Sequence, residues 1–308
     1  MDRKFNVITG HKGFVGSNLV KYLNNEHNII GVSRNPSNTE LSYSDLTKEK
    51  LSRSKSLIHL AGIAHDLKSN SKISDYFAVN TDLTKKVFNN FLHSDCEVFI
   101  YLSSVKAVAD KVDGILKEDE PPNPLTAYGK SKLAAENYIL SKNIPKNKRV
   151  YILRPCMIHG PNNKGNLNLL YSFILKRIPY PFGKYHNRRS FVSVENLCFI
   201  IKELIDNDKI EPGVYHISDD IPLSSLDIVQ VISEVTGKPI MVLKLPKFFI
   251  KIIAKVGDFF SLPINSERLL KLTENYEVSN SKITRAINKK LPFSSIDGLK
   301  KTILSFES

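Results

Sequence analysis

The sequence contains only three cysteines among its 308 residues, Cys96, Cys156 and Cys198. They are odd in number, far apart and without the short spacing of a metal site. We therefore expect reduced thiols in the core of a cytoplasmic protein, and no bound metal.

Long hydrophobic runs are also lacking. The amino-terminal apolar run, residues 5–8, is too short for the core of a signal peptide. The most apolar later stretch, residues 248–264, is interrupted by Lys251, Lys255 and Asp258, so it cannot span a bilayer. We expect it to form an amphipathic helix packed on its own domain, in preference to one attached to a membrane surface.

Acidic residues are fewer than basic ones, 31 against 44, which gives a net charge of +13. Such a surplus can attract nucleic acid, anionic lipid or phosphorylated metabolites. The lysines are scattered, however, and the basic blocks interleaved with aromatic residues that nucleic-acid readers show are missing. We therefore expect a lysine-rich solvated surface and no nucleic-acid partner.

The first two-thirds of the sequence alternates short β-type runs with helical patterns, which predicts a parallel sheet covered by helices. The expected strands and helices are residues 5–9, 28–33, 56–60, 98–102 and 149–153, and residues 14–23, 81–92 and 127–141. After about Pro161, polar loops and short helices predict a smaller, mostly helical lobe. We predict an α/β fold with a Rossmann-type, doubly wound parallel sheet. The expected domains are residues 1–161 and a substrate-binding lobe at 162–308, of which 190–217 return to the first domain.

A glycine-rich turn, residues 9–16, joins the first expected strand to the first expected helix. Glycines at this place permit a tight turn, a close approach of the backbone to a pyrophosphate, and close packing of helix on strand. The amino terminus of the helix adds N–H groups that face an anion. The sequence therefore predicts a dinucleotide site, in which we expect Gly10, Lys12, Gly13, Phe14, Val15 and Gly16 to take part.

The end of the second expected strand, residues 31–35, carries no acidic side chain. An NAD-selective site usually places one there to hold the ribose diol. Arg34, next to Ser33, is available instead for a 2′-phosphate, although it is equally explained as an exposed loop residue. The sequence favours NADP, with NAD as the alternative. Further residues that we expect near the cofactor are Asp45, Leu46, Leu60, Ala61, Gly62 and Asn80, the last of which is equally explained as a helix cap.

Tyr128 and Lys132 are four residues apart, so on a helix their side chains share one face. A free phenol has a pKa of about 10 and is a poor acid–base catalyst at neutral pH. A nearby ammonium and a cationic nicotinamide favour the phenolate and lower that pKa. With Ser104 at the end of an expected strand, the three residues predict an oxidoreductase.

With these motifs, the chain resembles the extended short-chain dehydrogenases/reductases, which include nucleotide-sugar epimerases, dehydratases and 4-ketoreductases. The resemblance rests on the glycine-rich turn, His59-Leu60-Ala61-Gly62, Ser103-Ser104, Tyr128-x-x-x-Lys132, Arg154-Pro155 and His159-Gly160-Pro161. It implies that Ser104 orients the sugar, that Tyr128 exchanges the proton at O4, and that Lys132 binds the nicotinamide ribose and tunes Tyr128. It also implies a homodimer formed by the helices at 81–92 and 127–141.

The residues after Ser104 separate the branches of this family. A dehydratase needs an Asp-Glu pair there, whereas this chain has Val105-Lys106. The resemblance places Lys106, Asn166 and Arg189 at a UDP-sugar substrate. We expect NADPH-dependent reduction of a UDP-4-keto-6-deoxy-N-acetylhexosamine for surface polysaccharide synthesis. The alternatives are a UDP-glucose or UDP-N-acetylglucosamine 4-epimerase that retains NAD and, from another class, a non-catalytic dinucleotide sensor.

Overall fold

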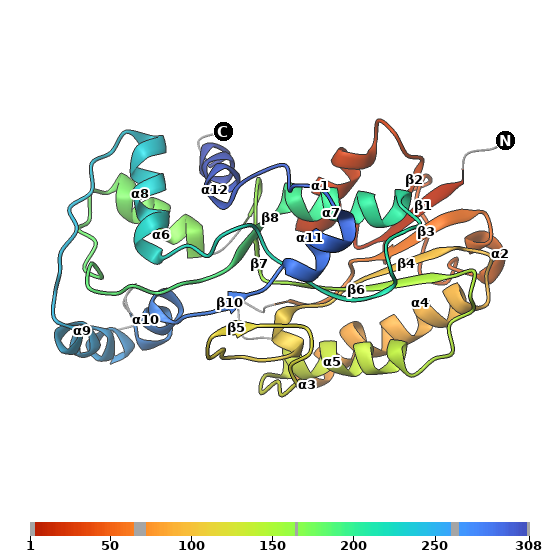
Figure 1. Ribbon diagram of the computed structural model, residues 1–308, viewed down its shortest axis with the longest axis horizontal. Coiled ribbons are helices and arrows are strands. Elements are labelled where there is room, and N and C mark those ends of the chain that lie inside the picture. Colours follow the sequence, from red (N-terminus) through yellow and green to blue (C-terminus); the bar gives the residue numbers. More distant parts are fainter. Residues whose placement is uncertain (1–3, 65–71, 164–165, 260–264, 307–308) are drawn as a thin grey trace.

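A six-stranded sheet forms the centre of the molecule, in the order β2-β1-β3-β4-β6-β9 (Figure 1). Every neighbouring pair of its strands is parallel. The computed structural model describes residues 4–64, 72–163, 166–259 and 265–306. The strands of the sheet are β1 (Phe5–Thr9), β2 (Ile29–Val32), β3 (Ser54–His59), β4 (Val98–Leu102), β6 (Arg149–Pro155) and β9 (Gly213–Ile217).

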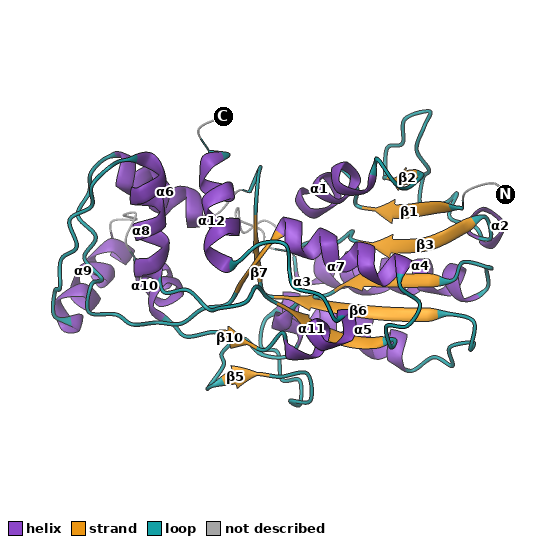
Figure 2. Ribbon diagram, turned by 45° about the horizontal axis from the view of Figure 1, so that its top comes forward, coloured by secondary structure: helices purple, strands orange, loops and turns teal. Residues whose placement is uncertain are grey.

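Helices cover both faces of this sheet (Figures 1 and 2). Consecutive strand residues point to opposite sides: Val7 packs in the core beneath α4 (Leu83–Leu92) and α5 (Ala127–Leu140), and Ile8 in the core beneath α1 (Phe14–Leu23) and α7 (Val194–Asp206). Strands that are apolar on both faces are typical of a parallel sheet between two helical layers. The predicted fold class is confirmed.

The remaining elements form the edges of this domain and a second lobe, on the left in Figure 1. Two small parallel sheets pair β5 (Ile115–Leu116) with β10 (Glu277–Val278) and β7 (Met157–His159) with β8 (Phe191–Ser193). The other helical elements are α2 (Lys48–Leu51), α3 (Ile73–Tyr76), the π-helical turn η1 (Phe77–Asp82), the 3₁₀ turn η2 (Val105–Ala107), α6 (Asn166–Leu175), α8 (Ser225–Thr236), α9 (Lys247–Phe259), α10 (Ser266–Thr273), α11 (Ser281–Ile287) and α12 (Ser295–Leu304).

Two details differ from a simple alternation of strands and helices. The helix expected over residues 81–92 is preceded by the π-helical turn η1, which runs directly into α4. After β8 the chain returns through α7 to β9, which pairs with β6 at the edge of the central sheet. The division into residues 1–161 and 162–308 remains a prediction.

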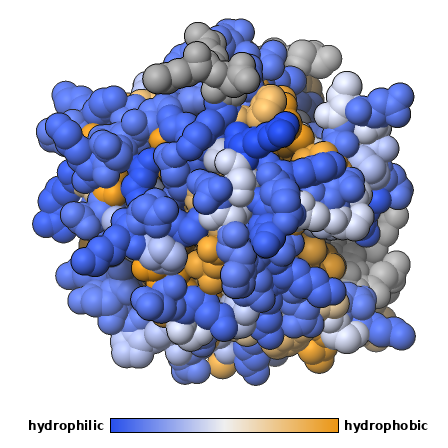
Figure 3. Space-filling model, turned by 90° about the vertical axis from the view of Figure 1, so that its right-hand side faces the viewer, coloured by the Kyte–Doolittle hydropathy of each residue, from blue (hydrophilic) through white to orange (hydrophobic). Residues whose placement is uncertain are grey.

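The surface over the amino-terminal strands is mostly hydrophilic. Figure 3 shows this end of the molecule, where hydrophobic residues appear only in small separate spots. Among the described residues, no helix has both the length and the apolar character needed to cross a bilayer.

Candidate active site

The carboxyl ends of β1, β3 and β4 bring three sequence motifs to one edge of the sheet. The glycine-rich turn follows β1, Leu60 to Gly62 follow β3, and Ser104 follows β4. From β1 the chain runs to β2 on one side of the sheet, and from β3 it runs to β4 on the other side. Open α/β sheets bind ligands in the crevice where the strand order reverses in this way. The candidate site is therefore at this edge.

The glycine-rich turn has the geometry that a dinucleotide pyrophosphate requires. Gly10 has a φ of +71°, and a Cβ atom there would lie 2.8 Å from the backbone nitrogen of Ala61. A Cβ atom on Gly16 would collide with the carbonyl of Gly10, so these two glycines close the turn tightly. Gly13 is exposed and precedes the first turn of α1, whose N–H groups have no partners within the helix. Phe14 and Val15, both half-buried, pack against the core beneath α1.

An acidic side chain does occupy the end of β2, and this corrects the sequence analysis. The loop after β2 folds back, because the amide of Leu41 donates to the carbonyl of Gly31 at 2.9 Å. This brings an Oε atom of Glu40 to 2.7 Å from Nε2 of His11 and the other to 2.8 Å from Nζ of Lys12. We expected no acidic side chain at the end of β2 because residues 31–35 contain none. This expectation is wrong, because the fold brings Glu40 there from further along the chain. The reason for favouring NADP is thereby removed.

The contacts of Glu40 define its charge. Hydrogen bonds from Lys12, from the amide of Ser37 and from His11 lower the pKa of Glu40 to about 2, so the group is a carboxylate at neutral pH. Nδ1 of His11 lies 3.2 Å from the carbonyl oxygen of Val32. Ser33 is half-buried beside Glu40, whereas Arg34 is exposed.

Asp45 and Leu46 occupy the turn before α2. The carboxylate of Asp45 accepts hydrogen bonds from the amide of Ser42 at 2.9 Å and from its hydroxyl at 2.7 Å. Leu46 is only 1% exposed and packs in the core beneath α4 and α5. The side chain of Leu46 is therefore too buried to contact adenine. Of the two residues expected there, Asp45 alone is accessible to the cofactor.

Asn80 joins the loop after β3 to α5. Its Oδ1 accepts from the amide of Ile63 at 2.8 Å, and its Nδ2 donates to the carbonyl of Ile63 and to Oγ of Ser131, each at 3.0 Å. Asn80 is fully buried and lies in the π-helical turn, a feature frequent at functional sites. A Cβ atom on Gly62 would lie 2.9 Å from Oδ1 of Asn80 and 3.1 Å from Nζ of Lys132. Asn80 is thus a support of the loop, and the simple helix cap considered from the sequence is wrong.

Ser104 follows β4, and Tyr128 and Lys132 are in the first two turns of α5. Thr126 caps α5 by accepting from the amide of Gly129 at 3.2 Å, which fixes the start of the helix that carries Tyr128 and Lys132. A hydrogen bond joins the hydroxyls of Ser104 and Tyr128. Nζ of Lys132 donates to the carbonyl of Leu102 at 2.8 Å, at the end of β4. The end of β4 and α5 therefore bring Ser104 and Tyr128 together, with Lys132 one helical turn from Tyr128 and anchored to the end of β4.

Burial dominates the electrostatics of this cluster. It raises the pKa of Tyr128, an effect that the hydrogen bond with Ser104 partly opposes and the charge of Glu136 reinforces. Burial also lowers the pKa of Lys132 to about 8, against the opposing effect of Glu136. In the absence of a bound positive charge the phenol is thus held in its neutral form.

Glu136 and Arg154 form a buried ion pair beneath the cluster that sequence analysis missed. Their closest atoms are 2.6 Å apart, and the two side chains are only 1% and 5% exposed. Ser103 also donates a hydrogen bond to the carboxylate of Glu136. Tyr128, Lys132 and Glu136 follow one another at intervals of four residues on one face of α5. This repeated spacing is a signal in the sequence by which Glu136 could have been found.

Lys106 connects the Ser104 turn to the second lobe. Its Nζ donates to the carbonyl of Asp110 at 2.8 Å and lies 4.4 Å from the ring centre of Tyr276. Tyr276 in turn forms a parallel β-bridge with Arg189. The expected substrate residues Lys106 and Arg189 are therefore both next to Tyr276, although they come from different lobes.

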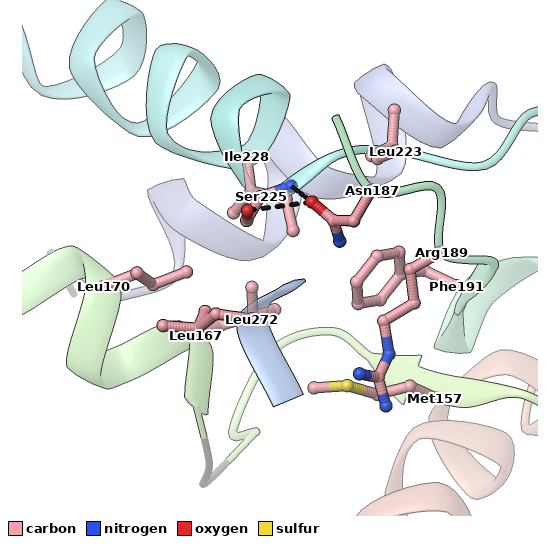
Figure 4. A pocket seen from close by; sticks show the side chains of 10 residues that line it. All are labelled: Met157, Leu167, Leu170, Asn187, Arg189, Phe191, Leu223, Ser225, Ile228 and Leu272. Carbon is pink, nitrogen blue, oxygen red and sulfur yellow. Dashed lines mark hydrogen bonds between the residues drawn. The ribbon is translucent and has the colours of Figure 1, made fainter. Parts of the chain in front are cut away.

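Arg189 lines a cavity in the second lobe (Figure 4). The cavity lies between α6, α8, α10 and the small β7–β8 sheet. Its other lining residues are Met157, Leu167, Leu170, Asn187, Phe191, Leu223, Ser225, Ile228 and Leu272. Burial lowers the pKa of Arg189, which nevertheless stays a cation at neutral pH. The lining is thus mainly apolar with one cationic group.

Asn166, the third expected substrate residue, is the first residue of α6. Its side chain, like all of Lys164 and Gly165, lies outside the part of the chain that the structure describes. Its expected role remains a prediction.

Sugar-nucleotide 4-epimerases are among the known proteins that this chain resembles. A curated UDP-glucose 4-epimerase of Vibrio cholerae is 29% identical over 97% of this chain and 94% of its own. A solved UDP-N-acetylglucosamine 4-epimerase from Bacillus cereus superposes with a TM-score of 0.75 at 19% identity, covering 99% of this chain and 100% of that one. A UDP-glucuronic acid 4-epimerase from Bacillus cereus, in complex with UDP-glucuronic acid and NAD, gives 0.74 at 21% identity over 98% of both chains. At these identities the two structures show a shared fold.

The matching family model covers most of the chain. It spans residues 6–218, which include the glycine-rich turn, Ser104, Tyr128 and Lys132. The chain belongs to the NAD dependent epimerase/dehydratase family.

Proposed function

We propose that the protein is a UDP-sugar 4-epimerase that works with NAD. The observation that carries this proposal is the cluster in which Tyr128 is hydrogen-bonded to Ser104 and lies one helical turn from the buried Lys132. The names of the Vibrio cholerae and Bacillus cereus relatives support the reaction, and the NAD bound to one of them supports the cofactor.

Each residue of the cluster has a defined part in this chemistry. Tyr128 takes the proton from O4 of the sugar and later returns it, while Ser104 hydrogen-bonds the same oxygen. NAD, held by the glycine-rich turn and Lys132, would supply the hydride chemistry at C4 of the sugar. Burial raises the pKa of Tyr128, and a positive charge on the neighbouring Lys132 would favour the phenolate that the reaction needs.

The second strand supports NAD in preference to NADP. The carboxylate of Glu40 at the end of β2 is of the kind that holds a ribose diol, and it would repel a 2′-phosphate. An epimerase borrows and returns one hydride, so a retained NAD suits it. A reductase consumes its cofactor in every turnover.

A dehydratase is disfavoured by the turn after Ser104. Val105 is buried and apolar, and the ammonium of Lys106 is bound to the carbonyl of Asp110. Neither side chain can act as the carboxylic acid that expels water from the sugar.

The cavity around Arg189 supports a nucleoside diphosphate as the rest of the substrate. A guanidinium among apolar side chains suits a diphosphate followed by a planar base. The proposed substrate therefore reaches from this cavity past Tyr276 to Tyr128. The homodimer formed by α4 and α5 remains a prediction.

The 4-ketoreductase predicted from the sequence is the second candidate. It uses the same three residues and differs in the fate of the hydride. The exposed Arg34, next to Ser33 at the end of β2, is the observation in its favour. A non-catalytic sensor has no need of the Ser104, Tyr128 and Lys132 cluster.

One assay separates these candidates. The purified protein would be offered UDP-glucose and UDP-N-acetylglucosamine without added cofactor and, separately, a UDP-4-keto-6-deoxy-N-acetylhexosamine with NADPH. We expect interconversion of one of the first two with its C4 epimer and no net change in nicotinamide absorbance. Stoichiometric loss of NADPH with the ketone alone would overturn the epimerase in favour of the reductase. Inactivity in both arms would overturn the proposed substrate class.

A further inference from the structure

The helix α9 exposes a hydrophobic face at the end of the second lobe. Ile250 and Ala254 are 1% exposed and anchor the helix to its lobe. Five large apolar side chains on its other side are between 46% and 84% exposed. They are Phe248, Phe249, Ile252, Val256 and Phe259, and we call them the α9 apolar face.

These five side chains are contiguous. At about 100° of rotation per residue they fall within a single arc of about 100° on the helix surface. The rings of Phe248 and Phe249 lie 4.0 Å apart, centre to centre. The amphipathic helix expected from the sequence therefore packs on its own domain through the side that carries Ile250 and Ala254. The side that faces away from the domain is apolar as well. Monomeric proteins rarely expose contiguous apolar patches without a function.

Three lysines line one edge of this arc. Lys247, Lys251 and Lys255 are exposed and succeed one another at intervals of four residues. Lys247 lies 5.1 Å from the ring centre of Tyr185, whereas Lys251 and Lys255 form no ion pair with another described residue. The one acidic residue of the helix, Asp258, accepts hydrogen bonds from the amide and hydroxyl of Ser266. The edge is therefore positively charged.

The position of the helix leaves its outer face accessible. Figure 1 places α9 at the end of the molecule opposite the amino-terminal strands, where it neighbours α10. Leu272 of α10 lines the cavity of Arg189. A surface bound to α9 would thus be near the lobe that we propose for the nucleotide.

We propose that α9 attaches the protein to the surface of an anionic membrane. An interfacial helix lies in the membrane plane, with aromatic and aliphatic side chains among the acyl chains and lysines at the headgroups. The α9 apolar face and its lysine edge have this arrangement, and their charge complements anionic phospholipid. A protein partner fits less well, because lysine is depleted in protein–protein interfaces. This inference does not depend on the proposed reaction.

Vesicle co-sedimentation of the full chain tests the proposal. The probes are vesicles of phosphatidylcholine alone and of phosphatidylcholine with phosphatidylglycerol. We expect the protein to sediment with the second kind only, and less strongly as salt is added. Lys251→Gln/Lys255→Gln should weaken partitioning about 30-fold, from about fivefold for each lysine near an anionic surface. Phe248→Ser/Phe249→Ser should abolish it while leaving the far-ultraviolet circular dichroism unchanged.

A matched control separates this helix from general attraction by a basic protein. Lys48→Gln/Lys50→Gln makes the same charge change on α2, at the other end of the molecule, and should leave partitioning unchanged. Equal losses in the two lysine variants would overturn the proposal, as would wild-type protein that fails to sediment. Light scattering without lipid gives a further check. If Phe248→Ser/Phe249→Ser turned a dimer into a monomer, a second copy of the chain would be the occupant of this face and the proposal would be wrong.

Discussion

Nε2 of His11 lies 2.7 Å from a carboxylate oxygen of Glu40, which joins the glycine-rich turn to the loop after β2. The imidazole fits there because Gly31 has no side chain: a Cβ atom on Gly31 would come within 2.6 Å of the ring. This pairing positions a negative charge where a dinucleotide cofactor would present the hydroxyls or the phosphate of its adenosine ribose. The choice between NAD and NADP is therefore open to a direct test.

Glu40→Gln is expected to weaken NAD binding by about ten- to a hundredfold, the usual effect of losing a hydrogen bond to a charged group. The same change should strengthen NADP binding, because Lys12, His11 and Arg34 would then face a 2′-phosphate without a nearby carboxylate. Isothermal titration with each nucleotide measures both effects. Glu49→Gln on α2 is the matched control, since Glu49 is exposed and pairs with Lys48. Equal changes for NAD and NADP would contradict the role of Glu40.

Tyr128→Phe is expected to keep the fold and the affinity for the cofactor while lowering turnover by about two to four orders of magnitude, the typical contribution of a positioned acid–base group. Tyr138→Phe, on the same helix, is the control: its hydroxyl donates to Oδ1 of Asn89 at 2.7 Å and lies outside the cluster. Steady-state rates of the purified variants measure the difference. Near-normal turnover of Tyr128→Phe would remove Tyr128 from the reaction.

The parts of the structure that the sequence predicts correctly depend on local patterns. Consecutive apolar residues such as Val7 and Ile8 indicate a strand that is buried on both faces. The four-residue interval between Tyr128 and Lys132 requires only a helix, and Ser104 needs only the end of a buried strand. These features hold because each is determined within a few neighbouring residues.

The parts that were missed depend on contacts between distant residues. Glu40 reaches the glycine-rich turn through the pairing of Leu41 with Gly31, which no local pattern reveals. Asn80 supports the loop after β3 through an amide that also bonds to Ser131, 51 residues later. The apolar pattern of α9 shows that the helix has hydrophobic sides, but tertiary packing decides which of them is covered. Sequence periodicity does not contain this information.

Glu136→Gln is expected to destabilise the protein by about 3–5 kcal/mol, because it leaves the buried guanidinium of Arg154 without its counter-charge. Urea unfolding measures the loss. Glu136→Gln combined with Arg154→Met should recover much of it, since no unpaired charge then remains buried. If the double variant is as unstable as the single one, the ion pair is not the cause.

The same two variants report on the electrostatics of the cluster. Glu136 opposes the lowering of the Lys132 pKa by burial and raises the pKa of Tyr128. Its removal lowers both values, so the pH profile of kcat should move to lower pH in the single and the double variant alike. In the double variant we therefore expect stability to recover while the pH profile stays shifted. A profile that returns to that of the wild type along with stability would show that Glu136 acts only on the fold.

His216 is expected to make the protein acid-sensitive. Burial, assisted by the positive charge of Arg154, lowers the pKa of His216 in the folded state to about 4, whereas an unfolded histidine titrates near about 6.5. As the pH falls through about 6.5 the unfolded chain binds a proton that the folded protein does not, so stability is lost until about pH 4. An interval of about 2.5 pH units corresponds to about 3 kcal/mol. In His216→Phe, the decline of the unfolding free energy between neutral pH and pH 4, measured by urea titration, should be smaller by up to this amount. Some decline should remain, because burial also lowers the pKa of His59 to about 3. Parallel curves for the variant and the wild type would show that His216 does not set the acid limit.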